Sequence, residues 1–438
     1  MPARSSSDAA PKVRVVVVSY GGRELTLACL RSVLASQWPT DRLEVVLVDN
    51  ASPDSVVAAV RDELPSVHVI ANSQNIGFAA GANLGLRDRA GIDYLALVNN
   101  DATVEPGWLR PLVGALETDR RLGAAAPKIL LASSFTPLLV RAPTSRPGRG
   151  DRRELGVRFS GVRVDGRDML ARTKVRRGTW GPEPAGEWTG PEAELLIPVP
   201  ASGITGCELR LDSERPTRVR TLSGPSGVEL AVDRTPSWFS VPLDTAATDI
   251  INNAGSELTA DDFGIDRGYL DPDDGRFDAT EDVFAWCGGA VLLRREYLDD
   301  VGLFDERLFL YYEDLELSWR GQAHGWRYAY VPTSVVRHVH AATSVEAAPR
   351  TQVLIESNRL LVLSRHAGWV RAARALLRFV LVTASYARRD VVSPMLHGRR
   401  PVGHTVAWRV RALARYLTKL PWFLPRRARS SAGHGKDS

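Results

Sequence analysis

A run of apolar residues from Tyr94 to Val98 ends in two amides and a carboxylate, Asn99, Asn100 and Asp101. Such a run is typical of a buried strand. In an open α/β sheet, ligands bind beyond the carboxyl ends of the strands, so we expect Asp101 at the mouth of a cleft. A carboxylate there can hold a divalent cation against a phosphate. Turns also favour Asn and Asp, so this feature alone leaves both interpretations open.

Three earlier runs also end in polar or glycine-rich residues. The predicted strands are Val13–Tyr20, Leu43–Val48 and Val67–Ala71, and they lead into Gly21-Gly22, Asp49-Asn50-Ala51-Ser52 and the segment from Asn72 to Asn83. The spacing of apolar residues predicts one helix over residues 24–36 and another that opens near Gly81 and runs to Arg89. Strands that alternate with helices predict a right-handed βαβ series and a parallel sheet.

The polar residues at these strand ends suit a nucleotide. Asp49 can accept hydrogen bonds from a base or a ribose, and Gly77 and Gly81 would let the backbone approach a phosphate. The alternative is that Asp49 and Asn50 open a turn and that the glycines adopt positive φ. No Gly-x-Gly-x-x-Gly follows the first strand, which argues against a dinucleotide enzyme.

Four segments together resemble the family 2 glycosyltransferases of GT-A fold, and within them the rhamnosyltransferase-like branch. They are Ser19-Tyr20, Val48 to Ser52, Asn75 to Asn83 and Asn99-Asn100-Asp101. The resemblance implies an α/β fold with a mostly parallel sheet flanked by helices, and an enzyme that uses a nucleotide sugar. The nucleotide-sugar-binding residues that it implies are Ser19, Tyr20, Asp49, Asn50, Asn75, Gly77, Gly81, Asn83 and Asn100.

The resemblance resumes downstream in Trp286–Arg295, Val301–Glu306 and Tyr311–Arg320. It implies acceptor-binding roles for Trp286, Gly288 and Gly289. It also implies that Asp314 is the general base of an inverting transfer, and that Glu313 is a second catalytic-site residue that orients an acceptor or a loop. A carboxylate suits this task because an acceptor hydroxyl loses its proton as it attacks. The alternative is that both acids only stabilise the start of a helix.

The resemblance further implies a divalent metal, Mn²⁺ or Mg²⁺, on Asp101 and a histidine. The run Val335–His340 is a predicted strand with two histidines on one face. His338 is the first choice of ligand and His340 the second, while a structural histidine is the alternative for each. Asn99 replaces an aspartate that many GT-A enzymes have, so fewer carboxylates would hold the metal here.

Residues 141–250 do not fit this pattern. Residues 141–153 are rich in Pro, Gly and Arg and are typical of a linker, and short alternating runs separated by turn residues follow them. These runs predict an all-β insertion, a small sandwich or barrel. Trp180, Trp188 and Trp238 could stack on sugars or belong to a core.

The C-terminal region is strongly basic. From Arg350 to Ser438 there are 18 Lys and Arg against 3 Asp and Glu, a net charge of +15, while the whole chain carries +5. Amphipathic helices are predicted over 368–387, where Arg371, Arg374 and Arg378 form one stripe, and over 406–420. Such helices are typical of anchors on an anionic membrane surface; the alternative is that they pack on the catalytic domain.

The chain is therefore predicted to comprise five parts: a disordered N-terminus (1–11), a nucleotide-sugar-binding half (12–140), the insertion (141–250), an acceptor and catalytic half (251–349) and the basic helices (350–438). Three scattered cysteines suit a reducing cytosol. Neither a signal peptide nor an apolar run long enough to span a membrane is recognised. We expect a cytoplasmic protein, peripheral on the inner face of the membrane.

The function expected is inverting transfer of a sugar from a nucleoside-diphosphate donor to a lipid-linked or cell-envelope polysaccharide acceptor. Rhamnose is the sugar that the resemblance suggests. The rival is a glycan-binding scaffold, in which a degenerate transferase domain presents a carbohydrate-binding insertion. A nucleic-acid-binding role rests only on the basic tail, because no groove-reading motif is present.

Overall fold

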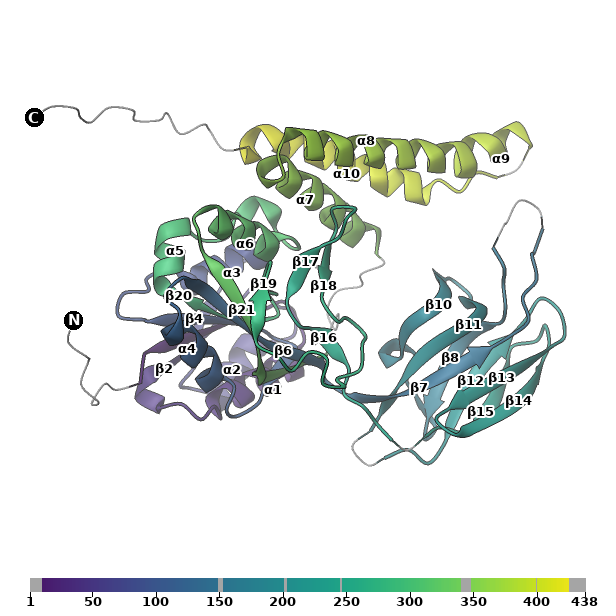
Figure 1. Cartoon of the computed structure of the whole chain (residues 1–438), viewed down its shortest axis with the longest axis horizontal. Helices are drawn as coiled ribbons and strands as arrows, with labels where there is room; N and C mark the ends of the chain where they lie inside the picture. Colours follow the sequence, from purple (N-terminus) through teal and green to yellow (C-terminus); the bar gives the residue numbers. More distant parts are fainter. Residues whose placement is uncertain are drawn as a thin grey trace, which may run out of the picture. The chain divides into compact units, whose positions relative to one another are not determined.

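The computed structural model describes residues 10–148, 153–200, 203–244, 246–339, 348–398 and 400–424 (Figure 1). The chain forms two compact units. The first comprises residues 1–129, 253–267 and 279–438, and the second comprises residues 130–252 and 268–278. Most of the N-terminal segment that we predicted to be disordered, and His340, lie outside the described residues.

Four parallel strands in the order β3-β2-β1-β4 form one half of the sheet in the first unit. They are β1 (Val13–Ser19), β2 (Leu43–Asp49), β3 (His68–Ala71) and β4 (Tyr94–Asn99). The helices that follow the first three are α1 (Arg23–Leu34), α2 (Val56–Glu63) and α3 (Phe78–Leu86). Apolar runs form β1, β2 and β4, which are mostly buried on both faces, while β3 is half-exposed at the edge of the sheet. The predicted βαβ series is confirmed, and α3 begins three residues before Gly81.

The other half of the sheet is antiparallel wherever its strand pairs are described. β20 (Ala290–Arg294) runs antiparallel to both β4 and β6 (Leu122–Leu131). β21 (Arg327–His338) runs antiparallel to β19 (Glu281–Val283) and β5 (Ala102–Val104). The sheet thus combines the expected parallel half with an antiparallel half. Apolar runs did not reveal this, because a strand buried on both faces looks alike whichever way its neighbours run.

Alternate residues of β1 enter two hydrophobic cores, one on each face of the sheet. Val13, Val15 and Val17 pack with α1 and α4 (Leu109–Thr118), while Val16 and Val18 pack on the other face. That second core also contains residues of α3, α5 (Arg295–Val301) and α6 (Glu313–Ala323). The remaining strands and short helix of this unit are β17 (Ser256–Leu258), β18 (Gly264–Asp266) and η1 (Thr40–Arg42), and β16 (Ile251–Asn253) lies at its border with the second unit.

The second unit is a β structure with its own hydrophobic core (Figure 1). Its main strand order is β14-β13-β7-β11-β8-β12-β15, with β10 beside β11 and β9 beside β8. The strands are β7 (Ser134–Arg141), β8 (Arg158–Val164), β9 (Arg167–Asp168), β10 (Lys174–Glu183), β11 (Gly186–Val199), β12 (Cys207–Asp212), β13 (Thr217–Ser223), β14 (Ser226–Val232) and β15 (Ser237–Val241), with the short helix η2 (Leu170–Arg172). The unit starts at Leu130, before the expected boundary, because β7 pairs with β11 and β13.

The three tryptophans of this unit differ in environment. Trp188 is buried, and the guanidinium of Arg163 lies 4.0 Å from the ring centre of Trp238. Trp180 is 48% exposed, and its indole N–H donates to the carbonyl of Glu154 at 3.0 Å. Trp180 therefore has the most open ring of the three.

The C-terminal helices pack on the rest of the first unit, to which they belong, through a separate hydrophobic cluster. They are α7 (Pro349–His366), α8 (Trp369–Tyr386), η4 (Ala387–Val392), α9 (Ser393–Leu396) and α10 (His404–Phe423). Arg371 and Arg378 of α8 form ion pairs with Asp262 and Asp261. The predicted basic stripe is thus partly neutralised by the first unit. Among the described residues, no helix is long and apolar enough to span a membrane.

Candidate functional site

Asp49 ends β2 and is held firmly beside the end of β1. Its carboxylate accepts a hydrogen bond from the Ser19 hydroxyl at 3.0 Å and from the Ser52 backbone N–H at 3.1 Å. The neighbouring Tyr20 side chain is 53% exposed. Register explains the first contact, because Ser19 and Asp49 are paired positions of adjacent parallel strands. The structure thus brings together a fixed carboxylate and an open aromatic ring at one strand edge.

Asn50 connects this edge to the segment before α3. Its amide N–H donates to the Gly77 carbonyl at 3.0 Å, and its side-chain oxygen accepts from Asn72 at 2.9 Å. Gly77 has φ +89°, and its N–H donates to the side chain of the exposed Asn75 at 2.9 Å. A Cβ at Gly81 would lie 3.0 Å from the Asn50 side chain. Protein atoms therefore occupy the space that these glycines leave.

Two further asparagines serve internal contacts. Asn83 is buried, and its side chain bonds to both backbone groups of Phe304 at 3.0 Å. Asn100 is also buried, and it donates to the Gly21 carbonyl and to the Thr26 hydroxyl at 3.0 Å each. Asn100 thereby fixes the turn that follows β1, while Asn83 fastens α3 to the segment before η3 (Glu306–Leu308).

Asp101 and His338 meet although 237 positions separate them. The carboxylate Oδ1 lies 2.9 Å from the imidazole Nε2, and both side chains are buried. The pairing of β5 with β21 places His338 opposite Ala102 and so beside Asp101. Asn99 contributes its amide nitrogen at 3.5 Å from the same imidazole nitrogen.

Asp101 and His338 have a separation that suits two of the ligands of a divalent cation. Two cis ligands of an octahedral ion with bonds of about 2.1 Å lie roughly 3 Å apart, and the Asp101–His338 separation is close to that value. Within the described residues, no group of three or more His, Cys, Asp and Glu side chains forms a metal site. The diphosphate oxygens of a nucleotide sugar are of the chemical class that could complete the ligand set of an ion bound here.

Glu313 and Asp314 begin α6 directly after Tyr312, which has φ +71°. Asp314 accepts hydrogen bonds from the backbone N–H groups of Gly288 at 2.8 Å and Leu315 at 2.7 Å. Glu313 is only 5% exposed, and among the described residues its carboxyl oxygen Oε2 has no hydrogen-bond partner. The two acids are thus adjacent, with Glu313 buried and Asp314 half-buried, and among the described residues Asp314 is the one that receives such bonds from a second part of the chain.

These environments separate the proton affinities of the two acids. Burial, with the charge of Asp314 adding to it, raises the pKa of Glu313 to about 8. Burial also raises the pKa of Asp314, while the N–H groups of Gly288 and Leu315 oppose that shift. The pair therefore retains a proton near neutral pH, and hydrogen bonding favours placing it on Glu313. Asp314 is the member suited to accept a proton from a hydroxyl.

The turn before β20 links this pair of acids to Asp101 and His338. A Cβ at Gly288 would lie 3.5 Å from the Asp314 carboxylate, and the Gly289 carbonyl accepts the Asn99 N–H at 2.9 Å. Asn99 in turn adjoins His338. The sequence-predicted residues Asp314, Gly288, Gly289, His338 and Asp101 are thus brought into one continuous set of contacts. Trp286, in contrast, is fully buried, with its ring 6.0 Å from that of Phe304.

Sequence reasoning missed the conformation of the segment that precedes the two acids and the residue that holds it. Phe309, Tyr311 and Tyr312 all have positive φ, between +68° and +71°. Asn358 of α7 holds this segment through three of its carbonyl groups. No local sequence signal marks Asn358, because its partners lie about 50 positions earlier in the chain.

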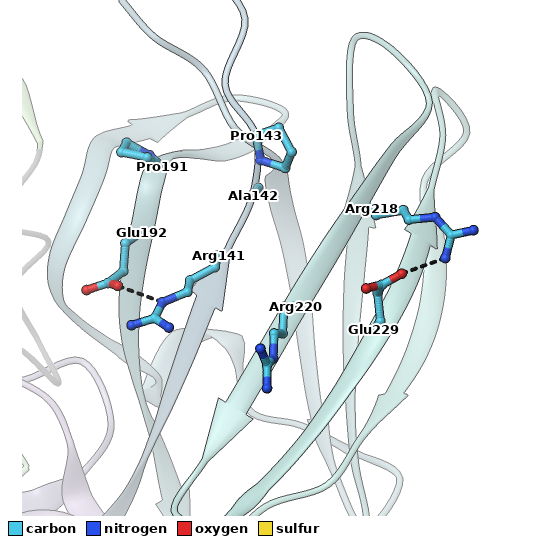
Figure 2. A pocket seen from close by; sticks show the side chains of 8 residues that line it. All are labelled: Arg141, Ala142, Pro143, Pro191, Glu192, Arg218, Arg220 and Glu229. Carbon is cyan, nitrogen blue, oxygen red and sulfur yellow. Dashed lines mark hydrogen bonds and ion pairs between the residues drawn. The ribbon is translucent and has the colours of Figure 1, made fainter.

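The second unit contains an open hollow of about 420 Å³ on the face of its sheet (Figure 2). Figure 2 shows Arg141 paired with Glu192 and Arg218 paired with Glu229 along its sides. Arg220 lies directly opposite Arg141 on the neighbouring strand. Charged side chains and the apolar residues Ala142, Pro143 and Pro191 thus line the hollow together, and none of the predicted catalytic residues is among them.

Two family models match the chain. The model described as "Glycosyl transferase family 2" matches residues 14–157, and the one described as "Glycosyltransferase like family 2" matches residues 273–353. The matched segments contain Asp49 and Asp101 in the first case and Asp314 and His338 in the second.

Curated relatives match a shorter part. The N-acetylglucosaminyl-diphospho-decaprenol L-rhamnosyltransferase of Mycobacterium tuberculosis is 38% identical over 100 residues, which are 22% of this chain and 32% of that protein. Glycosyltransferase AglE of Haloferax volcanii is 26% identical over 102 residues, 23% of this chain and 33% of that protein. The chain spans about a third of the length of these relatives.

Solved structures with distant similarity include two with bound nucleotides and Mn²⁺. GalNAc-T7 with UDP, GalNAc and Mn²⁺ is matched over 93% of this chain and 57% of that one, with a TM-score of 0.44. The mannosyltransferase PcManGT from Pyrobaculum calidifontis, in complex with GDP-Man and Mn²⁺, is matched over 96% and 91%, with a TM-score of 0.41. Each is 14% identical to this chain.

Proposed function

Because the chain belongs to glycosyltransferase family 2, we propose that it transfers a sugar from a nucleoside-diphosphate donor to an acceptor hydroxyl, with inversion at the anomeric carbon. The observation that carries the proposal is the adjacent pair Glu313–Asp314, one acid buried and one half-buried, and its chain of contacts to Asp101 and His338. A general base and a cation site within one continuous set of residues suit the departure of a diphosphate as an oxygen attacks.

In this proposal Asp314 accepts the proton of the acceptor hydroxyl while that oxygen forms its bond to the anomeric carbon. The bond from the anomeric carbon to the diphosphate breaks in the same step. Glu313, which burial keeps protonated near neutral pH, donates a hydrogen bond to a sugar or to a neighbouring loop. Asp101 and His338 hold Mn²⁺ or Mg²⁺, which supplies positive charge against the diphosphate.

Donor binding is assigned to the edge formed by Ser19, Tyr20 and Asp49. Asp49 is fixed by two hydrogen bonds and can accept others from a base or ribose, while the exposed ring of Tyr20 can stack. The mycobacterial relative is named as an L-rhamnosyltransferase that acts on a diphospho-decaprenol. We therefore assign rhamnose as the sugar and a lipid-linked precursor of a cell-envelope polysaccharide as the acceptor.

The C-terminal helices suit peripheral contact with the inner face of a membrane. In α8, Trp369 is 83% exposed, and Leu377 and Leu381 are each about 60% exposed. In α10, Leu417 and Trp422 are exposed as well. Exposed apolar side chains that are flanked by basic residues favour an interface with anionic lipid. A membrane position would bring the site to a lipid-linked acceptor.

The rival function, a glycan-binding scaffold, is favoured by one observation in the second unit. Trp180 presents a half-exposed ring at the surface of that unit, and such rings can stack on sugar faces. We assign to the second unit a part in acceptor binding, which is compatible with catalysis by the first.

A donor panel separates the two functions. The full chain is incubated with nucleoside-diphosphate sugars, membrane lipid extract and Mn²⁺ or Mg²⁺, and the release of nucleoside diphosphate and the labelled lipid product are measured. We expect turnover with one donor class and none in the Asp314→Asn variant. Glycan binding with no release from any donor would favour the scaffold.

A further inference from the structure

Three of the four residues before the two acids have positive φ. Phe309 has φ +68° and ψ −60°, and Tyr311 and Tyr312 have φ +69° and +71°. None of them is glycine, and bulky residues rarely adopt positive φ because the Cβ crowds the backbone. Such conformations persist only where the surrounding structure determines them. The protein must therefore hold this segment by contacts from outside it.

Asn358 of α7 supplies the first of those contacts. Its side-chain Nδ2 donates to the carbonyl oxygens of Leu308 at 2.8 Å, Leu310 at 2.9 Å and Tyr311 at 2.8 Å. Asn358 is fully buried. One buried amide group thus contacts three backbone carbonyls of this irregular segment.

Arg415 of α10 fixes the orientation of that amide. Its Nη1 donates to the Asn358 side-chain oxygen at 2.6 Å and to the Ser357 hydroxyl at 2.7 Å, and its Nη2 donates to the Leu308 carbonyl at 3.3 Å. Because the guanidinium only donates, the amide must turn its oxygen to Arg415 and its NH₂ to the segment.

The charge of Arg415 is otherwise uncompensated in the described part of the chain, where no carboxylate lies within ion-pair distance of it. Burial lowers the pKa of its guanidinium. A half-buried cation without an acid is costly. Its hydrogen bonds to Asn358 and to backbone carbonyls are the compensation that the structure offers.

The other side of the strained segment touches the donor half of the site. The Phe309 carbonyl accepts the backbone N–H of Ala79 at 3.3 Å. A Cβ at Gly77 would lie only 2.6 Å from the same carbonyl oxygen. The segment therefore lies between the C-terminal helices and α3, and it leads directly into Glu313 and Asp314.

We propose that Asn358 and Arg415 are positioning residues for Asp314, acting by holding residues 309–312 in the strained conformation that orients the start of α6. This inference rests on the proposed function for the role of Asp314. It makes α7 and α10 parts of the active site rather than a detachable anchor.

The test compares Arg415→Gln and Asn358→Asp with the wild type. Arg411→Gln is the matched control, because Arg411 lies one turn earlier on α10 and is exposed. The rate is measured with the donor and acceptor on which the wild type turns over. We expect kcat to fall at least about tenfold in both variants, with a smaller change in the donor KM, and no change in the control. Arg415→Lys keeps the positive charge but has fewer hydrogen-bond donors, and its kcat should lie between those of Arg415→Gln and the wild type.

Two readouts separate positioning from a general loss of folded protein. The acid limb of the kcat profile should move to lower pH in Arg415→Gln, because a loosened segment admits water to Asp314 and reverses the effect of burial on its pKa. Hydrogen–deuterium exchange of residues 305–318 should accelerate in the same variant and not in Arg411→Gln. If the variant only contained less folded protein, kcat would fall by the same factor at every pH, and the acid limb would stay at the same pH.

The proposal is overturned if kcat and exchange in both variants match the wild type, or if kcat falls while the acid limb and the exchange stay unchanged. A wild type that is inactive on every donor would instead overturn the proposed function. In that case faster hydrogen–deuterium exchange in the variants would still support the claim that Asn358 and Arg415 stabilise residues 309–312. Unchanged exchange would overturn that claim. If Arg415→Gln does not fold, the same comparisons are made with Arg415→Lys.

Discussion

The donor edge and the catalytic segment of this protein are built by opposite means. At the donor edge, regular parallel strands end side by side, and neighbouring positions such as Ser19 and Asp49 bond directly. In the catalytic segment, residues 309–312 leave regular conformation and are held by Asn358 and Arg415. Short-range sequence pattern thus positions one half of the site, whereas the other half depends on elements that come later in the chain.

The largest expected effect tests the catalytic segment. Asp314→Asn keeps the shape of the side chain and removes its basicity. We expect transfer to fall by at least about 10²-fold, as for loss of a general base, while nucleotide binding measured by calorimetry persists. The matched control is Glu313→Gln, which resembles the protonated acid and should reduce the rate by less than about tenfold. If the two substitutions had equal effects, the separation of roles between the acids would be wrong.

The next largest effect tests whether Asp101 and His338 bind one cation together. Asp101→Ala and His338→Ala should each weaken Mn²⁺-dependent donor binding by more than about tenfold, or about 1.4 kcal/mol, because both would ligate one ion. EDTA should abolish transfer by the wild type. Asn99→Ala is the control, since it adjoins His338 without supplying a carboxylate or imidazole. Activity that withstands EDTA and both substitutions would show that the site works without a metal.

The same contrast explains what could be predicted from the sequence. The parallel strands, the polar residues at their ends and the β character of the second unit follow from local periodicity. The proximity of Asp101 and His338 depends on the register of β5 and β21, and only the resemblance to a family suggested it. The strained backbone and its contacts with Asn358 and Arg415 had no local signal, since Asn and Arg are ordinary helix residues. Strand direction in the antiparallel half had no local signal either, because burial does not encode it.

A pH experiment sharpens the electrostatic side of the comparison. The folded-state pKa of Glu313 is raised to about 8 from 4.5, so the folded protein binds a proton that the unfolded chain releases. Its contribution to stability is therefore present below about pH 4.5 and is lost as the pH rises to about 8. We expect Glu313→Gln to remove this loss, on the order of 1–3 kcal/mol. Denaturant unfolding at pH 5 and pH 8 measures the loss of stability in the wild type and in Glu313→Gln. Equal losses in the two proteins would contradict this expectation.

Removal of most of the second unit should leave the donor chemistry of the first unit intact. The Leu131 N–H donates to the Ile250 carbonyl at 2.8 Å, so a short Gly/Ser linker can replace residues 132–249. We expect hydrolysis of the donor by water to stay within about threefold of the wild-type rate, while transfer to the acceptor declines. Thermal unfolding shows whether the shortened protein folds. If it does not, the second unit supports the core of the first and is not a separable acceptor-binding part.

The smallest expected effect concerns the outer face of α8. Because Arg371 and Arg378 pair with Asp262 and Asp261, the net charge of the tail overstates its attraction to lipid, and apolar burial should matter more. We expect Leu381→Ser to weaken binding to vesicles of anionic lipid by about three- to tenfold, since a buried leucine contributes roughly 1.5–3 kcal/mol when its burial is complete. Arg374→Gln should weaken it about twofold, less than the roughly 1 kcal/mol of a free basic residue near the surface.

Ser385→Ala, at an exposed polar position of α8, is the control for this comparison. Co-sedimentation with the vesicles is measured from low salt to concentrations at which the Debye length falls below roughly 8 Å. Binding should weaken with salt and not vanish, because salt does not screen the apolar contribution. Binding that disappears with salt and ignores Leu381→Ser would mean that charge alone attracts the tail. In that case the exposed apolar face of α8 would need another partner, and α7 and α10 would retain only their contacts with the catalytic segment.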